Sequence, residues 1–67
     1  MTDKVIAKRI KQYRKQSGLT QAGLAEKAGV ASTTIARVER GDNQASLPTI
    51  EKLAKALEIK ASDILGY

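Results

Sequence analysis

The side chains of this 67-residue chain that could do chemistry are amines, guanidiniums, carboxylates, hydroxyls and amides. Cysteine and histidine are absent, which excludes disulfides, thiolate zinc sites, histidine general bases and Cys–His or Ser–His nucleophile pairs. The sequence also has no glycine-rich phosphate loop and no converging carboxylates, so we expect neither an enzyme nor a metal or cofactor site. The chemistry that remains is binding through charge and hydrogen bonds.

Positive charge is concentrated at the start of the chain. Residues 1–16 hold six basic residues and one acidic residue, so this segment alone accounts for the net charge of +5. Such a segment would attract a polyanion such as nucleic acid. The alternative is a solvated basic helix face without a partner, and charge alone does not decide between the two.

The spacing of apolar residues predicts five helices and no strand. The first helix, about residues 3–17, presents one stripe to a core, formed by Ile6, Ile10, Tyr13 and Ser17. No apolar run approaches the roughly 18 residues that span a bilayer, and the N-terminus lacks the apolar block of a signal peptide. We therefore expect a cytoplasmic protein that makes no membrane contact.

Capping residues predict where the remaining helices begin. A second helix is expected over residues 21–28, and a third from Ala31 or Ser32 to Arg40. The expected N-caps of the second, fourth and fifth helices are Thr20, Ser46 and Ser62.

Gly29 interrupts what would otherwise be one amphipathic helix over residues 21–40. Glycine tolerates the positive φ of a tight corner, so we expect two short helices that meet at this residue. Ala25, four residues before the corner, is small enough to let the helices cross closely. Apolar residues on both sides then point into one wedge of core: Leu24, Ala28, Val30, Ile35 and Val38. This conjunction is typical of a helix-turn-helix.

The chain resembles the lambda-repressor-like, Cro/XRE-type helix-turn-helix regulators from about residue 6 to residue 65, through the segments SGLTQAGLAEKAGV, TTIARVERG, SLPTIEKLAKALEI and SDIL. Its length and the segment RGDNQASL resemble the restriction-modification controller proteins of that family. The resemblance implies one compact all-α domain over residues 1–67, with five helices and a helix-turn-helix formed by the second and third. It further implies a regulator, such as a repressor, that binds a (pseudo)palindromic operator in double-stranded DNA as a homodimer, without a small-molecule ligand.

In such a fold the leading end of the third helix faces base edges in the major groove. The candidates for base readout are Ala31, Ser32, Thr33 and Arg37. Arg37 is the main candidate, because a guanidinium can bond guanine O6 and N7 together, whereas Ala31 could touch a thymine methyl group. The alternative for Arg37 is a helix-surface ion pair with Glu39 or Asp42.

The hydroxyls of Ser32 and Thr33 have competing roles. Ala31 stands where an N-capping serine is common in the family, so either Ser32 caps the third helix or the cap is missing. A capping Ser32 would be less free to read bases, and Thr33 could be merely solvated. Arg37 would then carry more of the specificity.

Phosphate contacts are expected at the start of the second helix and near the end of the third. Gln21 opens the second helix, where its side chain and free backbone N–H groups can meet a phosphate, although it could also be a simple helix starter. The other candidates lie on the flank of the third helix or in the following loop: Thr34, Arg40, Asn43 and Gln44. Lys8, Lys11 and Lys15 are expected to supply long-range attraction.

The resemblance also implies an internal ion pair between Arg14 and Glu39, which would tie the first helix to the third. Arg14 borders the apolar stripe beside Tyr13, and Glu39 follows Val38 near the end of the third helix. Both positions are compatible with that pairing.

The alternative function is protein binding, by an antitoxin or anti-regulator that uses the same fold to hold a partner. The apolar C-terminal residues could serve such a partner, the core, or a homodimer interface, which is the role we expect for Ile59, Ile64, Leu65 and Tyr67. Core packing is the alternative for Ile59 and Ile64. Salt-dependent DNA binding would distinguish a regulator from a pure protein binder.

Overall fold

Helix-forming residues dominate the chain, and the computed structural model, which describes residues 3–41 and 46–66, folds them into helices with no strand in those ranges. In chain order the helices are α1 (Asp3–Gln16), α2 (Gln21–Ala28), α3 (Ser32–Arg40), α4 (Leu47–Ala56) and α5 (Ala61–Leu65). The predicted all-α fold of five helices is confirmed.

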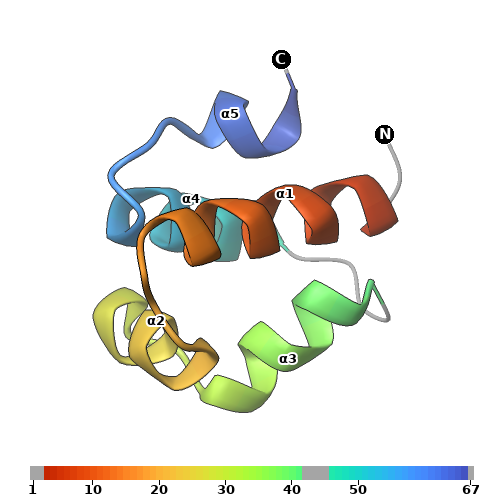
Figure 1. Cartoon of the computed structure of the whole chain (residues 1–67). Coiled ribbons are helices and arrows are strands. Elements are labelled where there is room, and N and C mark those ends of the chain that lie inside the picture. The colour runs from red at the N-terminus through yellow and green to blue at the C-terminus, as the bar shows by residue number, and fades with distance from the viewer. Residues whose placement is uncertain (1–2, 42–45, 67) are drawn as a thin grey trace.

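The other helices lie above, behind and below α1 in Figure 1. α5 lies above α1 and α4 in this view, whereas α2 and α3 lie below and meet at a sharp corner. α3 packs against α1 and α2, α2 packs against α4, and α5 packs against both α1 and α4. Because its neighbours lie on one side, α3 presents its other side outward at the edge of the molecule.

Hydroxyl caps begin two helices where the sequence predicts them. Thr20 Oγ1 accepts the backbone N–H of Gly23 at 2.9 Å at the start of α2. Ser46 Oγ accepts the backbone N–H of Thr49 at 3.3 Å at the start of α4. Each cap satisfies one of the N–H groups that the first turn of a helix leaves without an intrahelical partner.

α5 begins earlier than predicted, and Ser62 is not its cap. The helix starts at Ala61, and the Asp63 carboxylate accepts the backbone N–H of Lys60 at 3.0 Å. Ser62 lies exposed within the first turn. The prediction was wrong because the helix begins one residue after Lys60, where the bond from the Lys60 N–H to Asp63 favours its start, and this places Ser62 inside the first turn.

The corner between α2 and α3 has the predicted geometry. Gly29 adopts φ 73° and ψ 33°, in the left-handed region. The backbone N–H of Val30 donates to the carbonyl of Ala25 at 3.0 Å, and the backbone N–H of Gly29 donates to the backbone carbonyl of Glu26 at 3.3 Å. This pattern closes α2 and turns the chain into α3. Ala25 is only 3% exposed, so its small side chain sits at the close crossing of the helices.

The core lies between the helices and contains side chains from all five of them. Its six fully buried large side chains are Ile10, Leu24, Ile35, Ile50, Leu53 and Ile64. The predicted stripe of α1 is correct for Ile10 and for the partly buried Ile6 and Tyr13. It is wrong for Ser17, which is exposed because α1 ends at Gln16.

Replacement of Gly29 by L-alanine is expected to lower the free energy of unfolding by about 1 kcal/mol, because an L-residue at positive φ brings Cβ against its own backbone. A Cβ at this position would meet no other atom within 4 Å, so crowding adds nothing. D-Alanine at position 29 is the matched control, since positive φ suits it, and should leave the chain at least as stable as the parent. Urea denaturation of the synthetic chains measures both effects, and an equal loss for the two stereoisomers contradicts this account.

Candidate nucleic-acid interface

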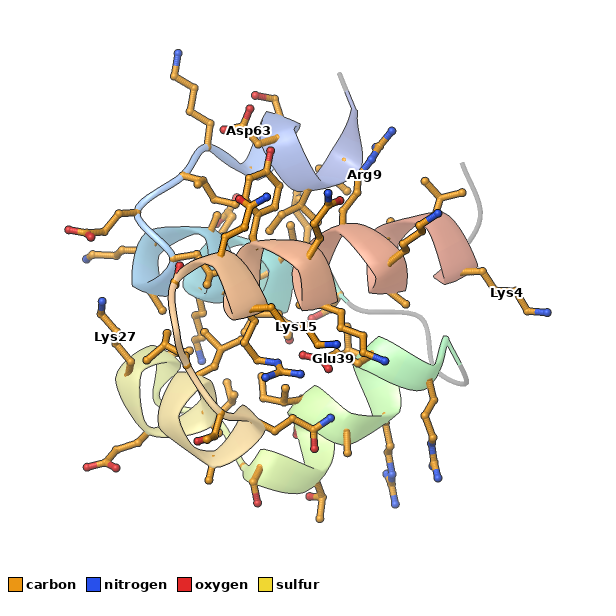
Figure 2. All side chains as sticks on the ribbon, in the orientation of Figure 1. Lys4, Arg9, Lys15, Lys27, Glu39 and Asp63 are labelled. Carbon is orange, nitrogen blue, oxygen red and sulfur yellow. The ribbon has the colours of Figure 1, made fainter. Side chains whose placement is uncertain are left out.

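α3 has one buried side and one exposed side. Ile35 is fully buried and Val38 is 5% exposed, and both belong to the core that α3 shares with its neighbours. The side chains on its other side project away from the rest of the molecule (Figure 2). Packing therefore anchors α3 along its length, while the polar residues on its other side, including Thr33 and Arg37, remain in solvent.

The four candidates for base readout lie on the exposed side of α3, with Ala31, Ser32 and Thr33 at its leading end and Arg37 in its last turn. Ala31, Ser32, Thr33 and Arg37 are all exposed. Thr33 and Arg37 are four residues apart, which puts them on one face of the helix, one turn from each other. Arg37 makes no ion pair with Glu39, because that carboxylate is bonded elsewhere, and Asp42 lies outside the described residues.

The start of α3 has no side-chain cap. Ala31 occupies the N-cap position with extended backbone angles, φ −71° and ψ 146°, and its methyl group accepts no hydrogen bond. Ser32 lies inside the helix and does not cap it, so of the two predicted possibilities the missing cap is observed. The first backbone N–H groups of α3 are therefore left for solvent or for an external acceptor.

Arg14 and Glu39 form the expected ion pair. Arg14 Nε donates to Glu39 Oε2 at 2.6 Å, and Arg14 Nη2 donates to Glu39 Oε1 at 3.0 Å. The two side chains are 11% and 3% exposed. Arg14 Nη1 also donates to the carbonyl of Leu19 at 2.8 Å, in the turn before α2. One guanidinium thus links α1, the turn that leads into α2, and α3.

The hydrogen bond to Glu39 raises the pKa of Arg14 above its ordinary value, although burial of the guanidinium acts in the opposite direction. Since the pKa in the folded state lies above that in the unfolded state, this stabilisation is fully present below the unfolded value. It is lost only in strong alkali, as the pH rises through the folded value. The Arg14 guanidinium therefore remains charged throughout the ordinary working range of a protein.

Gln21 also contacts the ion pair, which sequence reasoning missed. Its amide Nε2 donates to Glu39 Oε1 at 3.2 Å, while the Gln21 side chain is exposed at the first position of α2. Gln21, which we expect to bind a phosphate, therefore also contacts the buried carboxylate of Glu39. No local pattern could have predicted this contact, because it joins residues 18 positions apart on different helices.

The remaining phosphate candidates differ in position. Arg40 is exposed at the last position of α3, and Thr34 is half-buried on the flank of that helix. Asn43 and Gln44 lie outside the described residues. Gln21 thus lies on α2, and Thr34 and Arg40 lie on α3, the two helices that meet at the corner.

Four of the six basic residues of the first segment lie along one face of α1. Lys4, Lys8, Lys11 and Lys15 are exposed, and their spacing puts them in a row on the helix surface. Figure 2 shows Lys4 at one end of α1 pointing away from the molecule and Lys15 at the other end. This row suits long-range attraction of a polyanion rather than a shaped binding site.

The C-terminal candidates for a dimer interface do not all reach the surface. Ile64 is fully buried in the core, so its expected role in an interface is wrong. It lies on the side of α5 that packs against α1 and α4, and these helices cover it. Arg9 Nη1 of α1 donates to the carbonyl of Ile64 at 3.2 Å, which fixes that contact. Ile59 and Leu65 are partly buried and keep some exposed surface, and Tyr67 lies outside the described residues.

Two other kinds of site are absent from residues 3–41 and 46–66. None of the helices there is long and apolar enough to cross a bilayer. No group of three or more carboxylates in the same ranges comes together as a metal site would require. The exposed end of α3 and the start of α2 remain the candidate site.

Comparison with protein families matches this architecture. The helix-turn-helix family HTH_3 matches residues 10–64, a range that contains the whole of α2 and α3 and the corner between them. The chain belongs to this helix-turn-helix family.

This helix-turn-helix chain is similar to regulators from a phage and a bacterium. It is 44% identical over 61 residues to the immunity repressor protein of Bacillus phage phi105, covering 91% of this chain and 42% of the repressor. It is 39% identical over 62 residues to the transcriptional regulator SinR of Bacillus subtilis, covering 91% of this chain and 56% of SinR. The chain spans about half the length of these two relatives.

Solved structures of helix-turn-helix proteins superpose on the whole fold. The restriction-modification controller protein C.AhdI from Aeromonas hydrophila has a TM-score of 0.90 and 34% identity, covering 92% of this chain and 94% of the controller. SinR in complex with DNA has a TM-score of 0.86 and 39% identity, covering 90% of this chain and 97% of that one. The fold is that of the DNA-binding domains of transcriptional regulators, and the resemblance to Cro/XRE-type regulators is confirmed.

Replacement of Glu39 by alanine is expected to lower the free energy of unfolding by about 3 kcal/mol, because it leaves the Arg14 guanidinium buried without its counter-ion. Glu26→Ala, at an exposed position of α2, is the control and should change stability by less than about 0.5 kcal/mol. Thermal and urea denaturation followed by circular dichroism measure both variants. Equal stability of Glu39→Ala and the parent chain contradicts a stabilising role for the ion pair.

Proposed function

We propose that this protein is a sequence-specific DNA-binding transcriptional regulator that inserts α3 into the major groove of a (pseudo)palindromic operator as a homodimer. The observation that carries the proposal is the two-sided nature of α3, with Ile35 and Val38 held in the core and its polar leading end exposed. A major groove about 12 Å wide admits one helix presented in this way. The similarity to SinR, which was solved in complex with DNA, supports the proposal.

Base readout is assigned to the exposed face of α3. Arg37 can bond guanine O6 and N7 together, a pairing worth about 1–3 kcal/mol of discrimination. The hydroxyls of Ser32 and Thr33 make no hydrogen bond to any described residue, so both are available to bases or nearby phosphates. The methyl group of Ala31 can pack against that of a thymine.

Backbone binding is assigned to residues that flank this face. Gln21 at the start of α2 would bond a phosphate on one side of the groove, helped by the free N–H groups of the first turn. On the other side we assign Thr34, Arg40, Asn43 and Gln44. These contacts would fix the register of α3 in the groove without reading sequence.

Dimerisation is assigned to the C-terminal end of the chain. Ile59 and Leu65 keep exposed apolar surface beside α5, and Tyr67 follows them in the sequence. Two copies that pair by a two-fold axis would present two α3 helices to successive turns of the same face of DNA. Operator symmetry would then mirror protein symmetry.

Binding of a partner protein by the same fold is the second candidate function. The relative SinR was also solved in a complex with SinI, so a close homologue holds a protein partner. An antitoxin or anti-regulator that acts only in this way would need no operator. The two functions therefore differ in what they require of DNA.

Selection from random duplex DNA at controlled salt is expected to recover an inverted repeat whose half-sites are about one helical turn apart. Arg37→Ala should lose the preference for guanine at one position in each half-site and weaken operator binding by about 10-fold or more. Lys27→Ala, which removes a positive charge from the last turn of α2, is the matched control. An unchanged motif for Arg37→Ala contradicts its assignment as the main reader, and recovery of no motif contradicts the proposed function.

Operator affinity is expected to fall at least about 100-fold between about 50 mM and 200 mM salt, because several phosphates are neutralised and their counter-ions released. A titration of the parent chain against the selected duplex, followed by fluorescence anisotropy, measures this slope. A pure protein-binding domain would instead show no operator preference at any salt concentration. That outcome would favour the second candidate function.

A further inference from the structure

We propose that Glu39 is a positioning residue for DNA binding: its carboxylate orients the side-chain amide of Gln21 toward the DNA backbone, while Arg14 cancels the charge of that carboxylate. The inference rests on the proposed function, in which Gln21 meets a phosphate. It assigns to the buried ion pair a role in binding as well as in folding. Glu39 itself touches no DNA in this account.

The two oxygens of Glu39 are shared between three donors. Oε2 accepts from Arg14 Nε at 2.6 Å, whereas Oε1 accepts both from Arg14 Nη2 at 3.0 Å and from Gln21 Nε2 at 3.2 Å. The Glu39 side chain is 3% exposed, but Gln21 is exposed. In Figure 2 Glu39 lies in the layer between α1 and α3, on the inner side of the helix-turn-helix. The carboxylate therefore holds the amide from the protein side.

The charge state of Glu39 decides which way the amide of Gln21 is turned. An ionised carboxylate can only accept hydrogen bonds, so the NH₂ group of Gln21 must face it. That nitrogen carries two hydrogens, and the one not used by Glu39 remains available to an acceptor in solvent. A phosphate oxygen is such an acceptor, whereas reversal of the amide would put the carbonyl oxygen in the place of this nitrogen, where it would repel a phosphate.

A carboxylate beside a phosphate-binding group would normally weaken DNA binding, and Arg14 removes this difficulty. Its guanidinium bonds both oxygens of Glu39, so the pair carries no net charge. Arg14 also holds the backbone that leads to Gln21, because its Nη1 donates to the carbonyl of Leu19 at 2.8 Å and its own carbonyl accepts the N–H of Leu19 at 3.1 Å. The same residue thus neutralises the carboxylate and fixes the start of α2.

Glu39→Gln separates positioning from simple electrostatics, because the two predict opposite signs. Removal of a negative charge should by itself tighten binding to a polyanion. If Glu39 orients Gln21, the neutral amide lets Gln21 reverse, and affinity for a fluorescent mixed-sequence duplex of about 20 base pairs should fall about 10-fold, the value of one charge-assisted hydrogen bond. Glu26→Gln makes the same charge change at an exposed site of α2 and should leave affinity unchanged or slightly higher.

A double-mutant cycle with Gln21→Ala tests the pathway, which a purely structural role of Glu39 would not reproduce. In the Gln21→Ala background, Glu39→Gln should cause no further loss of affinity, measured at a temperature where circular dichroism shows every variant folded. Full additivity of the two losses, or tighter binding by Glu39→Gln alone, overturns the inference while leaving the proposed function intact. A parent chain that binds neither this duplex nor any duplex recovered by selection overturns both.

A measurement on the parent chain keeps the inference testable if Glu39→Gln does not fold. On addition of the duplex, the side-chain amide resonances of Gln21 should shift strongly in NMR spectra, whereas those of Gln12, exposed on α1, should not. A Gln21 amide that stays unshifted while DNA is bound would show that the oriented group does not meet the backbone. That result would also overturn the inference.

Discussion

The ion pair between Arg14 and Glu39 is the interaction on which the helix-turn-helix side of this small protein depends. Both charged side chains of the pair are almost completely buried, at 11% and 3% exposed. Burial of a guanidinium is tolerable here because Glu39 and the carbonyl of Leu19 accept from it. Its contacts join α1, the start of α2 and α3, so they fix where the two helices of the corner stand relative to the rest of the core.

Stability and binding are assigned to opposite sides of the same short helix. Ile35 and Val38 pack α3 against the core, so the residues at its leading end do not need to be buried and stay exposed. The missing cap at Ala31 costs the helix about 1 kcal/mol relative to a serine there. In return, the first N–H groups of α3 stay unbonded at the surface where we place the DNA. A group left unsatisfied by the fold is thus available to a ligand.

Features that depend on near neighbours in the chain were predictable. The corner at Gly29 and the caps at Thr20 and Ser46 follow from backbone angles and hydrogen bonds within one turn. The predictions were wrong for the start of α5, where neighbouring residues favour different helix starts, and for the side of α5 that packs into the core. The bond from the Lys60 N–H to Asp63 favours a helix start that leaves Ser62 inside the first turn, and the apolar C-terminal run did not reveal that Ile64 faces inward.

The sequence by itself determined the helices, the corner and the exposed polar end of α3, because each follows from interactions within about four residues. Only the tertiary structure decided which polar groups meet. Arg14 and Glu39 lie 25 residues apart, and the family resemblance rather than any local pattern suggested their pairing. Gln21 joins them from 18 residues away, and that contact was not foreseen. The crossing of three helices sets these distances, and helix crossings depend on the whole core at once.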